Sequence, residues 1–351
     1  MTGRPLSVLA WPDRKTGNPY TGLLYDAMRD RTDREVSVIE FSMGDAWRRR
    51  VDVLHVHWPE GCVESPSTAR ATAKTAAFLG TVAILRRRGT TVVWTCHNLE
   101  SHESHHPRLE HQLRDRFFSS LDGVIHLSSD SAERSDDAIP QLAGTPRCVV
   151  RHGHYRTLVS RPPDRAEARR SLGIDPEATV LAAVGHIRPY KNVPGLIETF
   201  TAADLPGAHL LVAGDAREPE LRAAVERAAG HPRVHLDLRW LTDDELSVRL
   251  AASDAVVLPY RNLHNSGAAI MALSADRPVA ISASGAIEDL ASITGPDWTM
   301  PLENELTTDR LADIVRWASR TRDGRPDLDP LDWEVVAADT LAAYDRFRSP
   351  R

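Results

Sequence analysis

Cysteine is scarce in this sequence of 351 residues, and no two cysteines have the spacing of a metal-binding or redox motif. Cys62, Cys96 and Cys148 are the only three, and they stand far apart. An odd number of isolated cysteines supports neither a disulfide framework nor a thiolate zinc site. A reducing compartment fits this pattern best, so we expect a cytoplasmic protein.

Long apolar runs are absent as well. No run approaches the roughly 20 residues that a membrane-spanning helix needs. Residues 1–10 lack a basic segment followed by an apolar one, which is the pattern of a signal peptide. The least polar stretch with a helical pattern, residues 69–85, is interrupted by Arg70 and Lys74. We therefore expect neither secretion nor a membrane span.

An excess of basic residues is also missing, since the formal net charge is -6. Proteins that follow nucleic-acid phosphates usually carry a basic excess, so we expect no nucleic-acid partner. Two local basic stretches remain, at residues 47–50 and 86–88. They could attract an anionic membrane surface that carries a lipid-linked substrate, or they could simply end helices.

What the sequence does contain is a repeated alternation of short β-branched runs with longer helical patterns. This alternation predicts an α/β fold with parallel, doubly wound sheets. The length suits two domains of roughly 150 residues each. The rhythm is interrupted near Pro162 and Pro163 and then restarts, so we place a boundary at residue 158 and a second domain over 159–330. The predicted strands are 6–10, 53–56, 91–95, 124–127, 149–150, 180–184, 210–213, 234–236, 255–258 and 279–281.

The strongest local signal follows the first strand of the second domain, where residues 185–192 read Gly-His-Ile-Arg-Pro-Tyr-Lys-Asn. Arg188 and Lys191 put two cations on a turn between a strand and a helix. Arg188 can bind two phosphate oxygens, and Lys191 can supply a point charge to a departing diphosphate. An ordinary surface loop is the alternative interpretation.

A second signal follows the strand at 255–258. Tyr260 leads through Asn265, Ser266 and Gly267 into an alanine-rich helix. A helix that begins with Ser and Gly offers free backbone N–H groups to an anion, although helix capping alone would also explain Ser266.

With these motifs the sequence resembles the GT-B glycosyltransferases, in particular the bacterial enzymes of glycosyltransferase family four. The resemblance implies two Rossmann-like domains that face each other across a cleft. It also implies an acceptor-binding domain over 1–158, a domain that binds the nucleotide sugar over 159–330, and a final helix at 331–351 that crosses back to the first domain. The shared motifs are the loop at 185–192, Val-Ala-Gly-Asp at 212–215, Leu-Pro-Tyr at 258–260, Ser-Gly at 266–267, Pro-Val at 278–279, and Trp333.

The resemblance implies that Arg188 and Lys191 hold the donor diphosphate, with help from Ser266 and Gly267. One departure concerns two glutamates that family members usually carry with seven residues between them, because Leu263 and Met271 stand at the corresponding positions. Ribose recognition must therefore differ here. The sequence is closer to a subset with Ser-Gly at this place, some members of which resemble β-mannosyl- or glucuronosyltransferases.

Two loops of the first domain resemble donor-binding segments of the family. Gly17 and Asn18 follow the first strand and resemble the glycine-containing loop that approaches the donor phosphate, although an ordinary turn would have the same residues. His154 and Tyr260, with Asn265, are candidates for contact with the donor or its sugar. For the segment around His154, a hinge at Gly153 is the alternative.

The segment at 55–60 supplies the candidate acceptor residues Trp58 and Glu60. If the strand continues to residue 60, these two side chains share one face, and Trp58 could stack on a sugar ring. The alternative is a structural role, in which Trp58 is buried and His55 is hydrogen-bonded in the core.

The loop that follows the strand at 91–95 gathers several ionisable side chains. We expect His97 to contact the transferred sugar or the acceptor, Glu103 to bind the acceptor, and Glu100 or His102 to act in proton transfer. A metal site formed by His102, Glu103 and neighbouring histidines is the alternative, but its spacing matches no helical ligand pair. We expect neither a metal nor a cofactor.

These features predict a glycosyltransferase that moves a hexosyl group from a nucleotide diphosphate sugar. A GDP-sugar is the preferred donor on resemblance and a UDP-sugar the next. The acceptor is a lipid-linked glycan or a small natural product. The alternatives are a sugar-nucleotide 2-epimerase of the same fold and a sugar-nucleotide-binding protein without catalytic activity.

Overall fold

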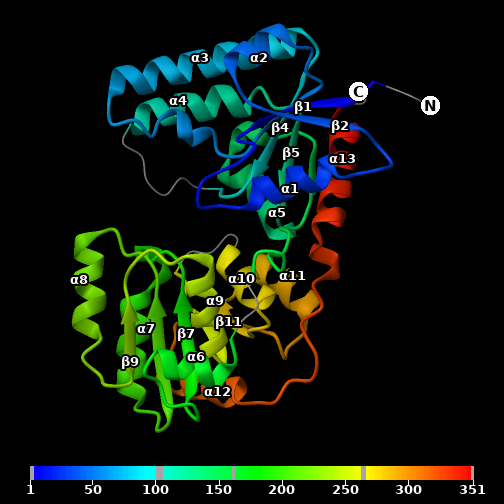
Figure 1. Ribbon diagram of the computed structural model, residues 1–351. Helices are drawn as coiled ribbons and strands as arrows, with labels where there is room; N and C mark the ends of the chain where they lie inside the picture. Colours follow the sequence, from blue (N-terminus) through cyan, green and yellow to red (C-terminus); the bar gives the residue numbers. More distant parts are fainter. Residues whose placement is uncertain (1–3, 100–105, 160–162, 262–265, 349–351) are drawn as a thin grey trace. The chain divides into compact units, whose positions relative to one another are not determined.

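The computed structural model describes residues 4–99, 106–159, 163–261 and 266–348 (Figure 1). The chain divides into two compact units. Unit 1 comprises Met1–Gly153 and Leu331–Arg351, and unit 2 comprises His154–Pro330. The first division lies a few residues before the boundary predicted at residue 158, so that His154 belongs to unit 2.

Unit 1 is built on a parallel six-stranded sheet in the order β2-β1-β3-β4-β5-β6. All residues of the central strands β3 and β4 are buried, because helices cover both faces of the sheet. This explains why these strands consist of nearly uninterrupted apolar runs. The strands are β1 Leu6–Trp11, β2 Val36–Glu40, β3 Val53–Val56, β4 Thr91–Cys96, β5 Gly123–His126 and β6 Arg147–Val149.

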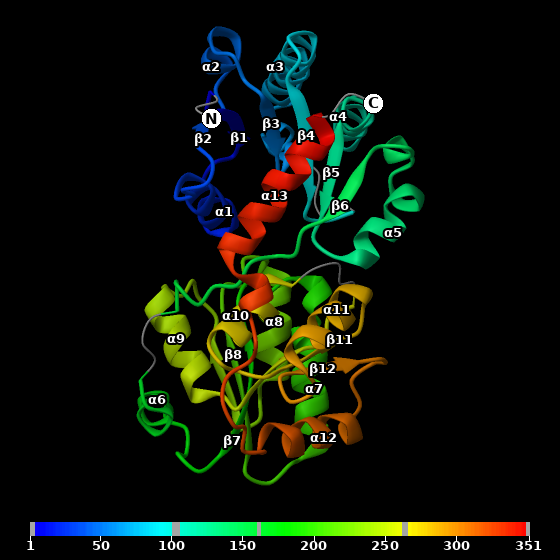
Figure 2. The same ribbon diagram turned by 90° about the vertical axis from the view of Figure 1, so that its right-hand side faces the viewer.

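The helices of unit 1 include the last helix of the chain, α13, which lies against α1, β4 and β5 (Figure 2). Two glycines allow α13 to pack closely. A Cβ atom at Gly153 would come within 2.5 Å of the Trp333 ring, and one at Gly123 would overlap the Phe347 ring. The helices are α1 Tyr20–Arg29, α2 Met43–Arg48, η1 Pro59–Cys62, α3 Thr68–Arg87, α4 Pro107–Phe118, α5 Ser129–Ala138, η2 Pro140–Leu142 and α13 Trp333–Arg348.

Unit 2 contains a second parallel sheet of six strands in the order β12-β11-β10-β7-β8-β9. Its core joins the faces of β7, β8 and β10 to helices α7 and α12. The strands are β7 Thr179–Val184, β8 Ala208–Ala213, β9 Val234–Asp237, β10 Ala255–Leu258, β11 Val279–Ser282 and β12 Thr299–Leu302. The predicted α/β fold with two doubly wound domains is confirmed.

Four helices of unit 2, α6, α9, α10 and α12, begin with a side-chain cap. Thr242 and Glu245, for example, form a reciprocal capping box at the start of α9. No helix within the described ranges is both long enough and apolar enough to cross a bilayer. The helices are α6 Arg165–Ser171, η3 Pro189–Lys191, α7 Val193–Ala203, α8 Pro219–Ala228, α9 Asp243–Ala252, α10 Gly267–Ser274, α11 Gly285–Thr294 and α12 Thr308–Ala318, with η4 Asp329–Leu331 at the junction of the units.

Each sheet has one point at which the chain reverses the direction in which it adds strands. This switch lies between β1 and β3 in unit 1 and between β7 and β10 in unit 2. Ligands of open α/β sheets bind beyond the carboxyl ends of the strands at such points. The loops that follow β1, β3, β7 and β10 are therefore the places where a site is expected.

Candidate active site

The loop that follows β7 is held tightly against the end of β8. Gly185 and Gly214 both have positive φ angles, of 99° and 144°. A Cβ atom at Gly214 would collide with the carbonyl oxygen of Gly185. The Ile187 N–H donates to the Asp215 carbonyl oxygen at 2.9 Å. Only glycines allow this close backbone approach, which sets the position from which the next residues project.

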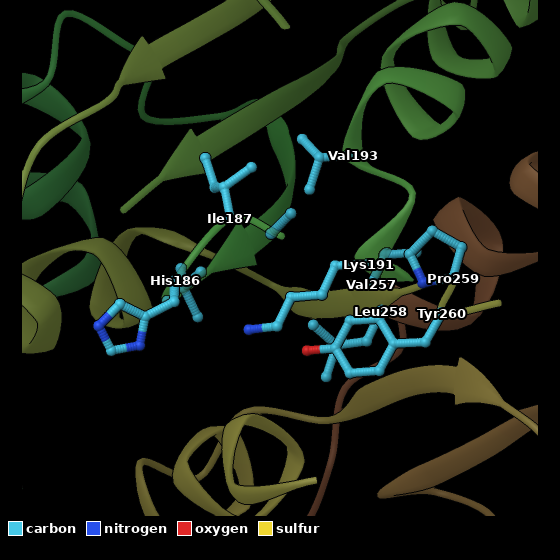
Figure 3. A pocket seen from close by; sticks show the side chains of 11 residues that line it. His186, Ile187, Lys191, Val193, Val257, Leu258, Pro259 and Tyr260 are labelled. Atoms are coloured by element: carbon cyan, nitrogen blue, oxygen red, sulfur yellow. The ribbon is translucent and has the colours of Figure 1, made fainter. Parts of the chain in front are cut away.

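Lys191 is the most unusual charge in this loop. It lines a pocket together with Gly185, Leu258 and Tyr260, and its ammonium nitrogen lies 5.5 Å from the centre of the Tyr260 ring (Figure 3). Burial, and then the charge of Arg188, lower the pKa of Lys191 to about 8. Within the described ranges no carboxylate forms an ion pair with it. A desolvated cation without a counter-ion favours the binding of an anion.

Arg188 lies at the start of the short helix η3 and is partly exposed. Its guanidinium nitrogen Nη1 is 3.7 Å from Oε1 of Glu218, which is a loose ion pair. Burial and the nearby charges of Lys191 and Arg188 lower the pKa of His186, so this imidazole is neutral near pH 7. Two cations and a neutral imidazole therefore share the loop at the switch point.

The loop that follows β10 leads to the second predicted anion-binding element. The Ser266 hydroxyl accepts a hydrogen bond from the Ala269 N–H at 3.1 Å, so it caps helix α10. Gly267 is the exposed first residue of that helix. Tyr260 is buried, and this burial raises the pKa of its hydroxyl group. The capping interpretation of Ser266 is thus confirmed, and the start of α10 still presents backbone N–H groups.

His154 is buried in unit 2, where its Nδ1 accepts a hydrogen bond from the Arg156 N–H at 3.2 Å. The N–H of the next residue, Tyr155, donates a hydrogen bond to the Ser274 hydroxyl oxygen at 2.8 Å. A Cβ atom at Gly267 would lie 3.6 Å from the Tyr155 hydroxyl. The segment that contains His154 therefore packs beside helix α10.

In unit 1, the loop after β1 forms a turn that leads into α1. The Asn18 N–H donates to the Lys15 carbonyl oxygen, and the Asn18 side chain accepts from the Tyr20 N–H at 3.0 Å. Gly17 is exposed and has a φ angle of 75°. Both residues thus have a turn-forming role, and Lys15 belongs to the same turn, beyond the carboxyl end of β1.

The strand β3 does not continue to residue 60, which was the condition for Trp58 and Glu60 to share one face. The strand ends at Val56, and the helix η1 begins at Pro59, because proline cannot donate to a strand ladder. Trp58 and Glu60 therefore do not share a strand face. Trp58 stacks on His97 with ring centroids 4.2 Å apart. The Lys15 ammonium nitrogen lies 4.0 Å from the centre of the Trp58 ring.

A buried network of hydrogen-bonded side chains lies beneath this edge, and we call it the histidine–tyrosine network. Its hydrogen-bond distances are 2.7 Å from His55 Nε2 to Thr95 Oγ1, 2.6 Å from His55 Nδ1 to the Tyr344 hydroxyl, 2.9 Å from His55 Nδ1 to the Tyr25 hydroxyl, 2.7 Å from His57 Nε2 to the Tyr25 hydroxyl, and 3.0 Å from His57 Nδ1 to His97 Nε2. Burial lowers the pKa of all three histidines, that of His55 to about 3. The network is therefore uncharged near pH 7, and the core role considered for His55 is confirmed.

Several predicted residues lie outside the described ranges, namely Glu100, His102, Glu103 and Asn265. Their predicted roles stay predictions. Among the residues that the structure does describe, no three histidines, cysteines or carboxylates form a group that could hold a metal ion.

Lys15, Tyr25 and Tyr344 were not predicted from the sequence. Lys15 stands two residues before Gly17, in the loop after the first predicted strand. A cation at such a place could have marked Lys15 as a candidate site residue. Tyr25 and Tyr344 lie within helices at opposite ends of the chain, and only the packing of α13 on α1 brings them together.

Comparison with known proteins agrees with this geometry. A family model described as "Glycosyl transferases group 1" matches residues 178–316, which include both loops of the unit 2 site. A GDP-mannose:glycolipid 4-beta-D-mannosyltransferase from Xanthomonas campestris pv. campestris is 33% identical over 325 residues, which are 91% of this chain and 85% of that protein.

Solved structures show the same fold at low sequence identity. A glycosyltransferase from Rickettsia africae ESF-5 has a TM-score of 0.66 at 12% identity, over 99% of this chain and 100% of that one. Anabaena HepE, solved in complex with UDP and glucose, has a TM-score of 0.61 at 17% identity, over 98% of each chain. The resemblance predicted from the sequence is thereby confirmed. With a relative of this identity matched over most of both sequences, the chain belongs to the group 1 glycosyltransferases of GT-B fold.

Proposed function

We propose that this glycosyltransferase transfers a hexosyl group, with mannosyl as the first candidate, from a GDP-sugar to a lipid-linked glycan. The observation that carries this proposal is the 33% identity, over 91% of the chain, to the mannosyltransferase whose name gives GDP-mannose as donor and a glycolipid as acceptor. The geometry of both units is compatible with these substrates.

Unit 2 supplies the donor site in this proposal. Lys191 and Arg188 neutralise the diphosphate, and the N–H groups at the start of α10 donate to its oxygens. Because the glycosidic bond breaks toward the diphosphate, negative charge grows on the leaving group during the reaction. Because Lys191 and Arg188 are already in place when this charge develops, they lower the activation barrier, and no metal is needed for that step.

Unit 1 supplies the acceptor site. Trp58 lies after the carboxyl end of β3, where it stacks on His97 and has the Lys15 ammonium group over its ring. Together the indole, the imidazole and the ammonium group would offer a sugar both apolar and polar contacts. The predicted roles of Glu100, His102 and Glu103 in proton transfer and acceptor binding belong to the same proposal.

A surface of unit 1 fits contact with an anionic membrane, where a lipid-linked acceptor would be found. Met43 and Trp47 on α2 are 47% and 53% exposed. The Arg88 guanidinium donates to the Trp47 carbonyl oxygen at 2.7 Å and so joins the end of α3 to this patch. The patch consists of Met43, Trp47, Arg48, Arg49, Arg50, Arg86, Arg87 and Arg88, all exposed. Exposed tryptophan among arginines is typical of proteins that bind an anionic bilayer surface.

The test is a transfer assay with labelled GDP-mannose, UDP-glucose or no donor, in the presence and absence of extracted lipid-linked oligosaccharides. We expect label to enter the organic phase only with GDP-mannose and acceptor together. Lys191→Ala should abolish this transfer, whereas Lys74→Ala, at an exposed position of α3, serves as the matched control. Conversion of the donor sugar without acceptor would instead indicate a 2-epimerase, and binding without turnover would indicate a protein without catalytic activity.

A further inference from the structure

A group of arginine side chains lies at the edge of the unit 2 sheet that is opposite to the pocket of Lys191. Because β10 and β11 are parallel neighbours, their amino ends share one edge and their carboxyl ends the other. The Lys191 pocket includes Leu258, the last residue of β10, whereas Asp254 directly precedes β10 and Arg277 stands two residues before β11. This arginine group, which faces the carboxylates of Asp254 and Asp276, consists of Arg156, Arg165, Arg169, Arg277 and Arg325.

Arg277 is the member of the arginine group whose charge is not compensated. Its Nε atom is buried and has no hydrogen-bond partner. Within the described ranges no carboxylate lies at ion-pair distance from its guanidinium group. Burial, and then the charge of Arg165, lower the pKa of Arg277 from the ordinary 12.5 to about 10, so the group is still charged at pH 7. A partly buried cation in this state gains free energy when an anion binds beside it.

The carboxylate of Asp254 is already used by other groups. Its Oδ1 accepts a hydrogen bond from Arg165 Nη1 at 2.9 Å, and its Oδ2 accepts one from Arg169 Nη2 at 2.6 Å. The Val180 N–H also donates to Oδ2, at 2.7 Å. Two guanidinium groups therefore share this one negative charge, and it does not neutralise Arg277.

The second carboxylate, that of Asp276, is shared in the same way. The Arg325 Nε donates to its Oδ2 at 2.8 Å. Arg156 Nη2 lies 3.6 Å from its Oδ1. Asp254 and Asp276 are the two carboxylates whose charges act on Arg277, and each of them already faces two other arginines. The arginine group thus carries more positive charge than these carboxylates balance.

We propose that Arg277 and Arg165 form a second anion-binding site, which takes a phosphate group at the amino-terminal edge of the unit 2 sheet. The planar fork of a guanidinium group matches two oxygens of a phosphate, so Arg277 can bind it through two parallel hydrogen bonds. The Arg165 side chain is 51% exposed and reaches Asp254 through Nη1, so it can contact the same anion. The phosphate group belongs either to a soluble compound or to a lipid headgroup, and the site does not depend on the proposed sugar transfer.

Equilibrium dialysis with radiolabelled inorganic phosphate tests the site. The full chain is used as the Lys191→Ala variant, which weakens binding in the pocket of Lys191, and is compared with Lys191→Ala/Arg277→Met. Phosphate that remains bound at Arg188 is common to both proteins. We expect Arg277→Met to lower the affinity by about tenfold or more, as for loss of a hydrogen bond to a charged group. Arg170→Met, at an exposed position of the same helix as Arg165, is the matched control and should leave the affinity unchanged.

Thermal unfolding without phosphate separates a ligand-binding arginine from a structural one. Arg277→Met keeps an unbranched side chain and removes the uncompensated charge, so its unfolding midpoint should lie above that of wild type. Arg169→Met breaks a buried ion pair with Asp254 and should lower the midpoint. Phosphate should raise the midpoint of wild type more than sodium chloride of equal ionic strength does, and this difference should vanish in Arg277→Met. A lower midpoint in Arg277→Met without phosphate would show that its charge is compensated within the protein, which contradicts the proposal.

Sedimentation with vesicles distinguishes the two sources of the phosphate group. Wild type, Arg277→Met and Arg170→Met are mixed with phosphatidylcholine vesicles, with and without phosphatidic acid. Sedimentation that requires both phosphatidic acid and Arg277, without affinity for inorganic phosphate, assigns the site to a lipid headgroup. Binding of inorganic phosphate that requires Arg277 assigns it to a soluble phosphate compound, and both results together assign it to either source. If Arg277→Met changes neither the dialysis nor the sedimentation, the proposal is overturned.

Discussion

Lys191 makes the sharpest prediction, because the same property that prepares it for a diphosphate should destabilise the protein without one. Its pKa falls from the ordinary 10.5 to about 8, mainly through burial. A shift of this size corresponds to about 3 kcal/mol. Since the side chain is partly exposed, we discount the figure to about 1–2 kcal/mol for screening by solvent.

Lys191→Met keeps an unbranched side chain of similar length and removes the charge. We expect the free energy of unfolding to rise by about 1–2 kcal/mol at pH 7 in the absence of ligand. The sign follows from the lowered pKa: below pH 8 the folded protein bears the full cost of the buried charge. Between pH 8 and 10.5 the folded state releases the proton before the unfolded state does, so the advantage of the variant should shrink.

The assay is urea unfolding at pH 7 and at pH 10, with and without GDP. GDP should stabilise the wild-type protein and have little effect on Lys191→Met. The affinity of the wild-type protein for GDP should also weaken as the pH rises through about 8, because Lys191 loses its charge. A variant that is less stable than wild type at pH 7, or that responds equally to GDP, would refute this reasoning.

Three further predictions concern packing and the membrane surface. Trp47→Ala should lower binding to vesicles containing anionic phosphatidylglycerol by about tenfold in a co-sedimentation assay, whereas Trp240→Ala, at an exposed position of unit 2, should not. Gly214→Ala should destabilise the protein by about 3 kcal/mol or more in urea unfolding, since its φ angle is 144° and a Cβ atom would strike a backbone carbonyl. Gly123→Ala should cost about 2 kcal/mol through its overlap with Phe347, and equal stability would show that α13 can shift freely.

Much of the fold could be predicted because the signal is local. Ten of the observed strands overlap the short apolar or β-branched runs that the sequence displays directly. Two strands, β2 and β12, were not predicted, and each omission has a physical reason. β2 is a partly exposed edge strand, and β12 contains Pro301, which argues against a strand on propensity.

The residues of the candidate site also differ in whether a local sequence signal reveals them. Arg188 and Lys191 were predicted because both lie in one short loop after a strand. Trp58 and Glu60 do not share a strand face, because Pro59 starts a short helix and ends the alternation of faces, and their predicted contact with the acceptor stays a prediction. The tyrosines of the histidine–tyrosine network could not be found, since Tyr25 and Tyr344 meet only through the packing of two helices from opposite ends of the chain.

The measurement that tests the central claim most directly is isothermal titration calorimetry of the wild-type protein with GDP, UDP and ADP, repeated for Lys191→Ala and for Lys74→Ala. The account predicts that GDP binds most tightly. It also predicts that the affinity falls by about tenfold or more in Lys191→Ala, as for loss of one charge-assisted contact, and is unchanged in Lys74→Ala. Equal affinity of wild type and Lys191→Ala for GDP would contradict the claim that the loop after β7 holds the donor diphosphate.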